Sequence, residues 1–396
     1  MAQQLQEEAL DLSKSLGDRD LEGAVLASLG KLNQQMGELE EAIEYFDQAV
    51  AITHEIGNRP GAANSLGNLA DVYLQQGDLE RAEEHHQQAL TIHRETGDRN
   101  GEANALLSLG NGYADRGDLQ RAEGHYHRAL AIHREIDNRE GEARALSNLG
   151  VVYAKRGELD EAEEHLQKAL AIQRELGDRR HEAAAVGNLG NIYGERGDLE
   201  QSEELYQKAL TIDREIGNRL GEAQDLGSLG IVYANRGDLT RAEEHFKQSL
   251  EIMRETGKRL GEATALGNLG NIYYQRGDLQ QAEERYQQAL DIHREIGNRL
   301  DEALQLGNLG NVYLERGDPE RAEEHYQQAL DIHRDIGNRL GEAIALANLG
   351  GLAAQRDQQD EACRLLKEAA AIYEESGAGG EGPDKVRAAL QELGCE

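Results

Sequence analysis

The 396-residue sequence predicts an all-α fold, a right-handed superhelical solenoid of antiparallel helix pairs. Three observations lead to this prediction. The chain aligns with itself without a gap at an offset of 40 residues, and each 40-residue unit contains two apolar stripes at helical spacing. Only 38% of the residues are hydrophobic and 4% are aromatic, and Trp is absent. That composition suits thin stacked layers better than one large core.

The repeat is carried by residues that recur every 40 positions. The dipeptide Leu-Gly occurs in every full unit except at Leu69-Ala70. A column of tyrosines, which we expect to pack in the core, consists of Tyr73, Tyr113, Tyr153, Tyr193, Tyr233, Tyr273 and Tyr313. On this basis nine full units extend from residue 18 to residue 377.

Each unit is predicted to form two helices, as residues 98–137 illustrate. Asp98 can cap the first helix, and Gly117 can end it because glycine tolerates the left-handed conformation of a helix C-terminus. Asp118 can cap the second helix. The small residues Gly110 and Ala122 allow the two helices to approach closely. Since neither helix can bury its apolar face alone, neighbouring units are expected to stack.

A known repeat family matches this pattern. The residues Leu106, Leu109-Gly110, Tyr113, Gly117, Ala122, Tyr126 and Ala129 resemble the tetratricopeptide repeat in type and spacing. The usual repeat has 34 residues, whereas this one has 40, which is similar to the repeats of Pins/LGN-type adaptors, kinesin light chains and bacterial signalling proteins of this family. The resemblance implies a helical-repeat scaffold that binds proteins.

The two ends of the chain depart from the repeat. Residues 1–17 are interpreted as an N-terminal helix, either a cap or the remnant of a truncated unit. Residues 378–383 are expected to be a linker, and residues 384–396 a short C-terminal capping helix. In the last full unit Ala353 occupies the tyrosine column. Terminal repeats have solvent on one side, so they can lose core residues.

Composition argues against several functional classes. The formal charge of −33 repels phosphate, so we expect no nucleic-acid partner. No apolar run reaches the roughly 18 residues of a membrane span, and no signal peptide is recognised, so we expect no membrane association and a cytoplasmic location. Cys363 and Cys395 are too few for a disulfide framework and lack zinc-ligand spacing, and we expect no cofactor or metal. The oligomeric state stays open.

The resemblance implies that the first helices of successive units line a concave groove. Asparagine side chains there offer two donors and one acceptor and could hold a peptide backbone. Some of these asparagines could instead satisfy neighbouring helix backbones. Acidic residues in the groove favour a ligand that carries Lys or Arg, whereas a carboxylate clamp, if present, would involve the few basic residues. The candidate peptide-binding residues are Asn64, Asn104, Asn111, Arg144, Asn148, Lys155, Asn191, Asn235, Asn271, Asn311, Glu195 and Glu315.

Two columns of histidines and one of paired glutamates are interpreted as exposed polar residues of the second helices. Histidines eight residues apart on one helix lie about 12 Å apart along its axis, too far to share a zinc ion. Glu83-Glu84 and its copies recur in most units, whereas an enzyme has one site. His86 is an exception, because it occupies an aromatic core column. We therefore expect no enzymatic activity.

The sequence thus predicts a scaffold that binds an extended, basic protein segment in its groove. An alternative is that the chain forms the sensor or oligomerisation arm of a larger multidomain signalling protein.

Overall fold

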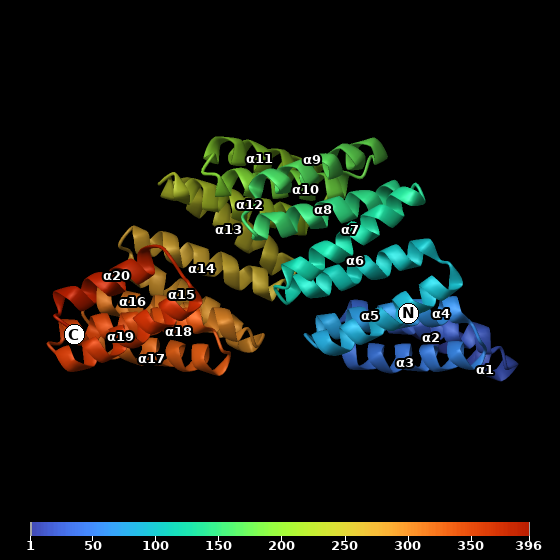
Figure 1. The fold of residues 1–396 in the computed structure, drawn as a ribbon, viewed down its shortest axis with the longest axis horizontal. Helices are drawn as coiled ribbons and strands as arrows, with labels where there is room; N and C mark the ends of the chain where they lie inside the picture. The colour runs from blue at the N-terminus through green and yellow to red at the C-terminus, as the bar shows by residue number, and fades with distance from the viewer. Residues whose placement is uncertain (1, 396) are drawn as a thin grey trace. The chain divides into compact units, whose positions relative to one another are not determined.

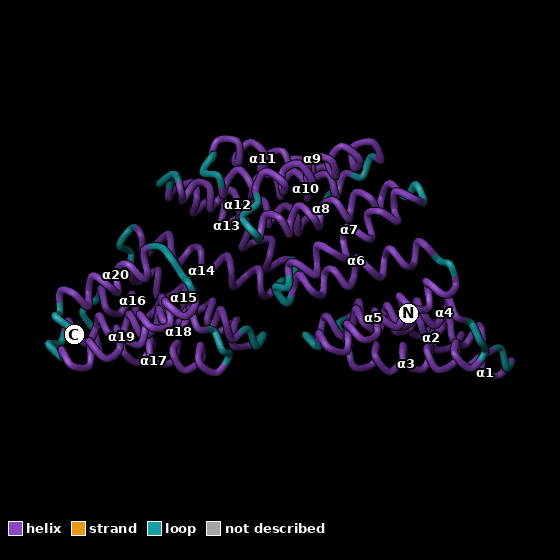
Figure 2. The backbone as a smooth tube through the Cα atoms, viewed as in Figure 1, coloured by secondary structure: helices purple, strands orange, loops and turns teal. Residues whose placement is uncertain are grey.

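The computed structural model describes residues 2–395, except for the side chains of residues 2–4 and 7, and in this part of the chain every regular element is an α-helix (Figures 1 and 2). The helices are α1 (Ala2–Leu16), α2 (Arg19–Met36), α3 (Leu39–Glu55), α4 (Arg59–Gln75), α5 (Leu79–Thr96), α6 (Arg99–Asp115), α7 (Leu119–Glu135), α8 (Arg139–Lys155), α9 (Leu159–Leu176), α10 (Arg179–Glu195), α11 (Leu199–Ile216), α12 (Arg219–Asn235), α13 (Leu239–Glu255), α14 (Arg259–Gln275), α15 (Leu279–Glu295), α16 (Arg299–Glu315), α17 (Pro319–Asp335), α18 (Arg339–Gln355), α19 (Gln359–Ser376) and α20 (Glu381–Glu392). The all-α prediction is confirmed.

The chain divides into two compact units, and the boundary lies within α11. The N-terminal unit ends at Leu205, and the C-terminal unit begins at Tyr206. In each unit the even-numbered helices from α2 to α18 are the first helices of the repeats, and the odd-numbered helices from α3 to α19 are the second helices. Within the units, first helices pack on their own second helices, for example α6 on α7, and second helices pack on the next first helix, for example α7 on α8. This sequential packing is that of a helix-pair solenoid.

Helix ends follow the predicted chemistry. The Asp98 carboxylate accepts a hydrogen bond from the Gly101 backbone N–H at 2.8 Å, and Asp118 accepts one from Arg121 at 3.1 Å. Most of the turns between helices contain a glycine with positive φ. Asp137 and Asp357 replace that glycine and still adopt φ values of +54° and +57°. Aspartate tolerates this conformation better than most residues do, so the repeat keeps its turn geometry at both places.

The core rests on close contact between the two helices of a repeat. A Cβ atom on Gly110 would overlap the ring of Tyr126, and Ala122 is fully buried. The tyrosine column is buried or half-buried, as expected. His86 is 3% exposed, so its prediction as a core residue is confirmed.

One histidine column contradicts the expectation of exposure. His93, His133, His293 and His333 lie near the ends of second helices and are at most 9% exposed. Glycines at the start of the next first helix make room for three of them, since a Cβ atom on Gly101, Gly141 or Gly341 would overlap the imidazole ring. The other column was also predicted to be exposed, but His85 and His125 are half-buried and stack on Tyr73 and Tyr113. The 40-residue period alone did not reveal this, because the glycines beside the His93 column come from the next repeat, and Tyr73 and Tyr113 come from the other helix of the same repeat.

These buried histidines predict a pH-dependent stability. Burial lowers the pKa of His133, as does the charge of Arg144, and burial also lowers the pKa of His293 and His333. The unfolded chain then binds these protons first, so stability is lost as pH falls through about 6.5. Gln173 occupies the same column in another repeat, so glutamine fits this position. Replacing all three histidines with Gln should therefore reduce the change in the urea midpoint of unfolding between pH 7 and pH 5. His54 is exposed, so the control variant His54→Gln should keep the pH dependence of the wild type. If the triple variant also keeps it, the buried histidines do not cause the pH dependence.

The prediction that both paired glutamates are exposed holds for only one residue of the pair at Glu83-Glu84. Glu84 is exposed, as predicted, but Glu83 accepts hydrogen bonds from the Tyr113 hydroxyl at 2.5 Å and from Arg116 at 2.6 Å. The same triad recurs at Glu123 with Tyr153 and Arg156. Glu83 and Glu123 therefore each join the second helix of one repeat to the first helix of the next.

Arginine carboxylate bridges explain the large excess of Arg over Lys. Glu142 on α8 accepts hydrogen bonds from Arg134 on α7 at 2.8 Å and from Arg139 at 2.5 Å. Arg139 also reaches Glu175 on α9 at 2.9 Å. Burial raises the pKa of Glu142, but the two arginines outweigh it and hold that pKa below its usual value. A planar guanidinium can bind two carboxylates at once, which a lysine cannot do in the same geometry.

The C-terminal end differs from its sequence-based prediction in two respects. Helix α20 begins at Glu381 rather than at residue 384, because Pro383 fits within the first turn, where its missing N–H is not needed. Cys363 on α19 forms a disulfide with Cys395, with a Cα–Cα separation of 5.5 Å. The sequence did not predict this pairing. Together with the hydrogen bond from Gln359 to the Leu393 carbonyl at 2.6 Å, it fixes α20 to α19.

Candidate functional site

An exposed apolar row lies on the first helices of the C-terminal unit. The second residue of α12, α14, α16 and α18 is a leucine between 37% and 52% exposed, and these residues are Leu220, Leu260, Leu300 and Leu340. One turn further along, Leu304 and Ile344 are 55% and 49% exposed. At the first of these columns the N-terminal unit instead has Asp20, Pro60, Asn100, Glu140 and Arg180. Exposed apolar side chains grouped on a chain this polar make these helices a candidate contact surface.

A cavity of about 360 Å³ opens within this row between α16, α17 and α18. Its apolar lining includes Leu304 and Ile344. Its polar lining includes the amides of Asn308, Asn311 and Asn348. Apolar walls with a few polar groups are typical of a ligand-binding pocket. We call the residues around this cavity the Leu/Asn face.

The asparagines predicted from the sequence have partners within the chain. Asn311 accepts a hydrogen bond from the Tyr326 hydroxyl at 2.7 Å, and Asn271 accepts one from Tyr286 at 2.7 Å. Burial raises the pKa of Tyr326, which keeps this hydroxyl protonated as a donor. The carbonyl oxygen of each asparagine is therefore occupied, and its NH₂ group is the part left for a ligand.

This pairing has a signature that the sequence analysis missed. An asparagine stands in this column only where a tyrosine follows 15 residues later, at Asn111/Tyr126, Asn191/Tyr206, Asn271/Tyr286 and Asn311/Tyr326. Where the later residue has no phenol, the column holds another residue, at Lys31/Phe46, Asp71/His86, Val151/Leu166, Ile231/Phe246 and Gly351/Leu366. Asparagine is therefore present at this position only where a buried tyrosine hydroxyl needs a hydrogen-bond acceptor.

The basic candidates do not converge. Arg144 and Lys155 are both exposed on α8, but their 11-residue separation corresponds to about 16 Å along the helix axis. Asn148 donates to the carbonyl of Asn111 at 3.0 Å, so these two predicted residues are in contact.

The remaining predicted residues all lie on first helices. Asn64, Asn235, Glu195 and Glu315 are exposed, on α4, α12, α10 and α16 respectively. Asn104 is half-buried on α6.

Among the residues that the structure describes, no group of three or more His, Cys, Asp or Glu side chains has the arrangement of a metal site. None of the described helices combines the length and hydrophobicity of a membrane-spanning segment.

Comparison with known proteins identifies the repeat. The tetratricopeptide repeat model matches residues 1–54, 24–95, 61–135, 101–175, 141–215, 181–255, 223–295 and 300–375. A search of curated proteins gives no significant match.

Several solved structures share the fold. BtubC from P. vanneervenii is 24% identical, with a TM-score of 0.51 and coverage of 55% of this chain and 92% of that one. The apo form of RapI is 16% identical, with a TM-score of 0.58 and coverage of 70% and 99%. A STAND protein with a tetratricopeptide repeat sensor from Pyrococcus horikoshii is 17% identical, with a TM-score of 0.57 and coverage of 78% and 46%. Since the family matches extend over most of the sequence, this chain belongs to the tetratricopeptide repeat family.

Proposed function

We propose that this chain is a non-catalytic scaffold that binds a segment of another protein on the Leu/Asn face of its C-terminal unit. The observation that carries this proposal is the cavity of about 360 Å³, flanked by leucines that no part of the described chain covers. Exposed leucine side chains are unfavourable in water, and covering them with a partner's apolar groups supplies binding free energy.

Charge favours a basic segment around that apolar contact. The chain has a net charge of −33, Asp301 lines the cavity, and Glu315 is exposed at the end of α16. Lys or Arg side chains of the partner would pair with these carboxylates. Such exposed pairs are screened by salt and act on association rate more than on affinity.

The asparagines contribute to backbone recognition. The NH₂ groups of Asn271 and Asn311 make no hydrogen bond within the part of the chain that the structure describes. Each can donate to a peptide carbonyl while its own carbonyl stays on the buried tyrosine. An extended segment offers a row of such acceptors.

A double substitution on the Leu/Asn face tests this function. Leu304→Thr with Ile344→Gln introduces residues that the chain already carries in the same column at Thr264 and Gln224. Both sites are about half exposed, so helical content should not change. Affinity for the purified partner, measured by calorimetry, should fall about tenfold or more, because two apolar contacts are lost.

The matched control makes a similar change in the N-terminal unit. Ala184→Thr alters the same helix position on α10, at an exposed residue outside the predicted binding set, and should leave partner affinity unchanged. If the double variant binds as tightly as the wild type, the Leu/Asn face is not the binding surface.

A sensor arm is the second candidate function. The STAND protein with a tetratricopeptide repeat sensor has the same fold, and this chain covers 46% of its length. The open reading frame of the gene distinguishes the candidates, because an effector domain fused to this chain favours the sensor and its absence opposes it.

A further inference from the structure

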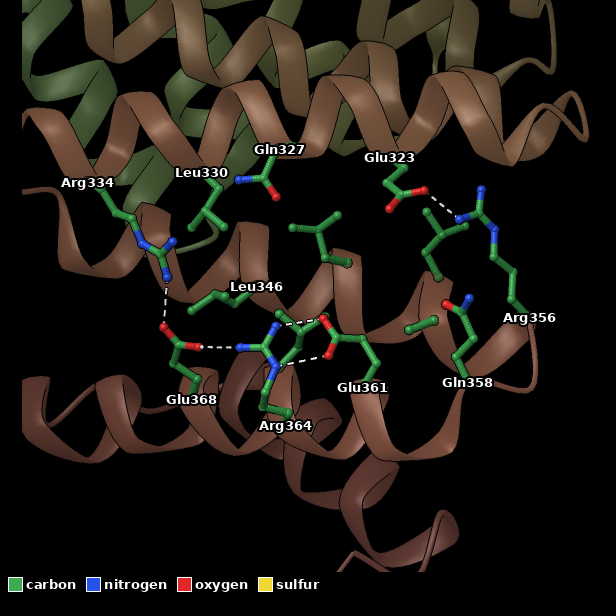
Figure 3. Close-up of a pocket in the computed structure, with 14 residues that line it drawn as sticks. Glu323, Gln327, Leu330, Arg334, Leu346, Arg356, Gln358, Glu361, Arg364 and Glu368 are labelled. Carbon is green, nitrogen blue, oxygen red and sulfur yellow. Dashed lines mark hydrogen bonds and ion pairs between the residues drawn. The ribbon is translucent and has the colours of Figure 1, made fainter.

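The last repeat contains a cavity that the preceding repeats fill with a tyrosine. It has a volume of about 140 Å³ and lies between α17, α18 and α19 (Figure 3). Ala353 lines it, at the position where seven earlier units have Tyr. The cavity therefore opens where this unit lacks the phenol ring that seven earlier units carry.

The earlier repeats show how a phenol is held at this position. The Tyr313 hydroxyl donates to Oε1 of Glu283 at 2.6 Å, while Arg316 binds the other carboxylate oxygen. The His325 ring lies 5.0 Å from the Tyr313 ring, centroid to centroid. The same arrangement is found at Tyr113, with Glu83, Arg116 and His125.

The last repeat keeps the carboxylate and the arginine without the phenol. Arg356 donates to Oε2 of Glu323 at 2.5 Å, as its counterparts do (Figure 3). No group in the described chain donates to Oε1 of Glu323, the oxygen that accepts the tyrosine hydroxyl in other repeats. Glu323 is 53% exposed, compared with 27% for Glu283. Leu365 takes the place of the stacking histidine and gives the site an apolar wall.

The rim of the cavity is held by ion pairs. Arg364 bridges Glu361 at 2.6 Å and Glu368 at 3.5 Å, and Arg334 binds Glu368 at 2.7 Å (Figure 3). These pairs connect α17 to α19 across the opening. None of the residues that line this cavity lines the Leu/Asn face.

We propose that this cavity is a binding site for a phenol ring, supplied by a tyrosine side chain of a partner protein. A cavity of about 150 Å³ is large enough to hold benzene. The phenol hydroxyl donates to Oε1 of Glu323, and the ring packs against Leu365 and Leu349, repeating the contacts that an internal tyrosine makes elsewhere. The rim arginines and glutamates offer hydrogen bonds to the partner's backbone around the tyrosine.

The test uses p-cresol, which has the structure of a tyrosine side chain. Titration into the whole chain, followed by ligand-observed NMR and by the melting temperature, should show saturable binding. Toluene should bind about tenfold more weakly or worse, because it cannot donate to Glu323. A short peptide with a central Tyr should compete with p-cresol, and its Phe counterpart should compete about tenfold less well.

Two variants and one matched control make the result specific. Ala353→Tyr should abolish p-cresol binding, because the chain's own phenol then fills the cavity. Glu323→Ala changes a half-exposed residue and should weaken p-cresol about tenfold while leaving toluene binding unchanged. Tyr313→Ala should open a second cavity and raise the stoichiometry to two. Absence of saturable p-cresol binding, or undiminished binding to Ala353→Tyr or Glu323→Ala, would overturn the proposal.

Discussion

The Asp225→Ala variant is expected to be more stable than the wild type by roughly 6 kcal/mol above pH 8, since each pKa unit corresponds to about 1.4 kcal/mol. Asp225 on α12 is 8% exposed, and its Oδ2 atom has no hydrogen-bond partner in the described chain. Burial, together with the smaller effect of the neighbouring charge of Asp213, raises its pKa to about 8. A buried carboxylate without a donor is costly when ionised.

The direction of the pH dependence follows from the different pKa values of Asp225 in the folded and the unfolded chain. The folded chain keeps the Asp225 proton up to about pH 8, whereas the unfolded chain loses it near pH 3.8. Stability therefore falls as pH rises across that window and is constant above it. The advantage of Asp225→Ala should be largest at pH 9 and should nearly disappear at pH 4.

Urea midpoints at pH 4.5, 7 and 9 provide the measurement. Alanine is the natural residue of this column at Ala105, Ala145, Ala185, Ala265 and Ala345, so the helix accommodates it. The exposed Asp47→Ala serves as the control and should show no such pH dependence. Equal midpoints for Asp225→Ala and wild type at pH 9 would show that Asp225 finds a compensating partner.

The fold could be predicted from the sequence because the same residue pattern recurs in every 40-residue unit. The capping by Asp98 and Asp118, the close approach at Gly110 and the core position of His86 all follow from the register of one unit. Contacts between units are different, because the partner belongs to another unit, between 8 and 30 residues away in these examples. The hydrogen bond of Tyr113 to Glu83 and the burial of His133 belong to this class.

The proposed binding surface was predicted only in part. The first helices carry the predicted asparagines, and Asn311 lines the cavity of about 360 Å³. Leu304 and Ile344 were missed, because an isolated leucine in a helical pattern is normally assigned to the core. The cavity at Ala353 was also missed, although the substitution was visible, because an empty site depends on the packing of three helices.

The Gly110→Ala variant is expected to lose about 1–3 kcal/mol of stability through overpacking. The new Cβ atom would overlap the Tyr126 ring, which a hydrogen bond to Asn111 holds in place at 2.7 Å. Alanine is the better helix former by about 1 kcal/mol, so a net loss shows that packing outweighs helix propensity.

One repeat of the chain already has alanine at the position equivalent to Gly110. The one unit with alanine in this column has Ala70, and the residue 16 positions later is His86 instead of a larger aromatic or leucine. Its asparagine position holds Asp71, whose Oδ1 lies 3.4 Å from Nε2 of His86. Ala70 and His86 are both buried, so this alternative set of three residues packs in the same space.

A double-mutant cycle therefore predicts a change of sign. Tyr126→His should destabilise the wild type, because it leaves a void and removes the hydrogen bond to Asn111. In the Gly110→Ala background the same substitution should stabilise, and adding Asn111→Asp should stabilise further. Urea midpoints of the four variants and the triple variant measure this coupling. Additive effects would show that the two helices adjust their separation independently in each repeat, and that the residues at 70, 71 and 86 are unrelated.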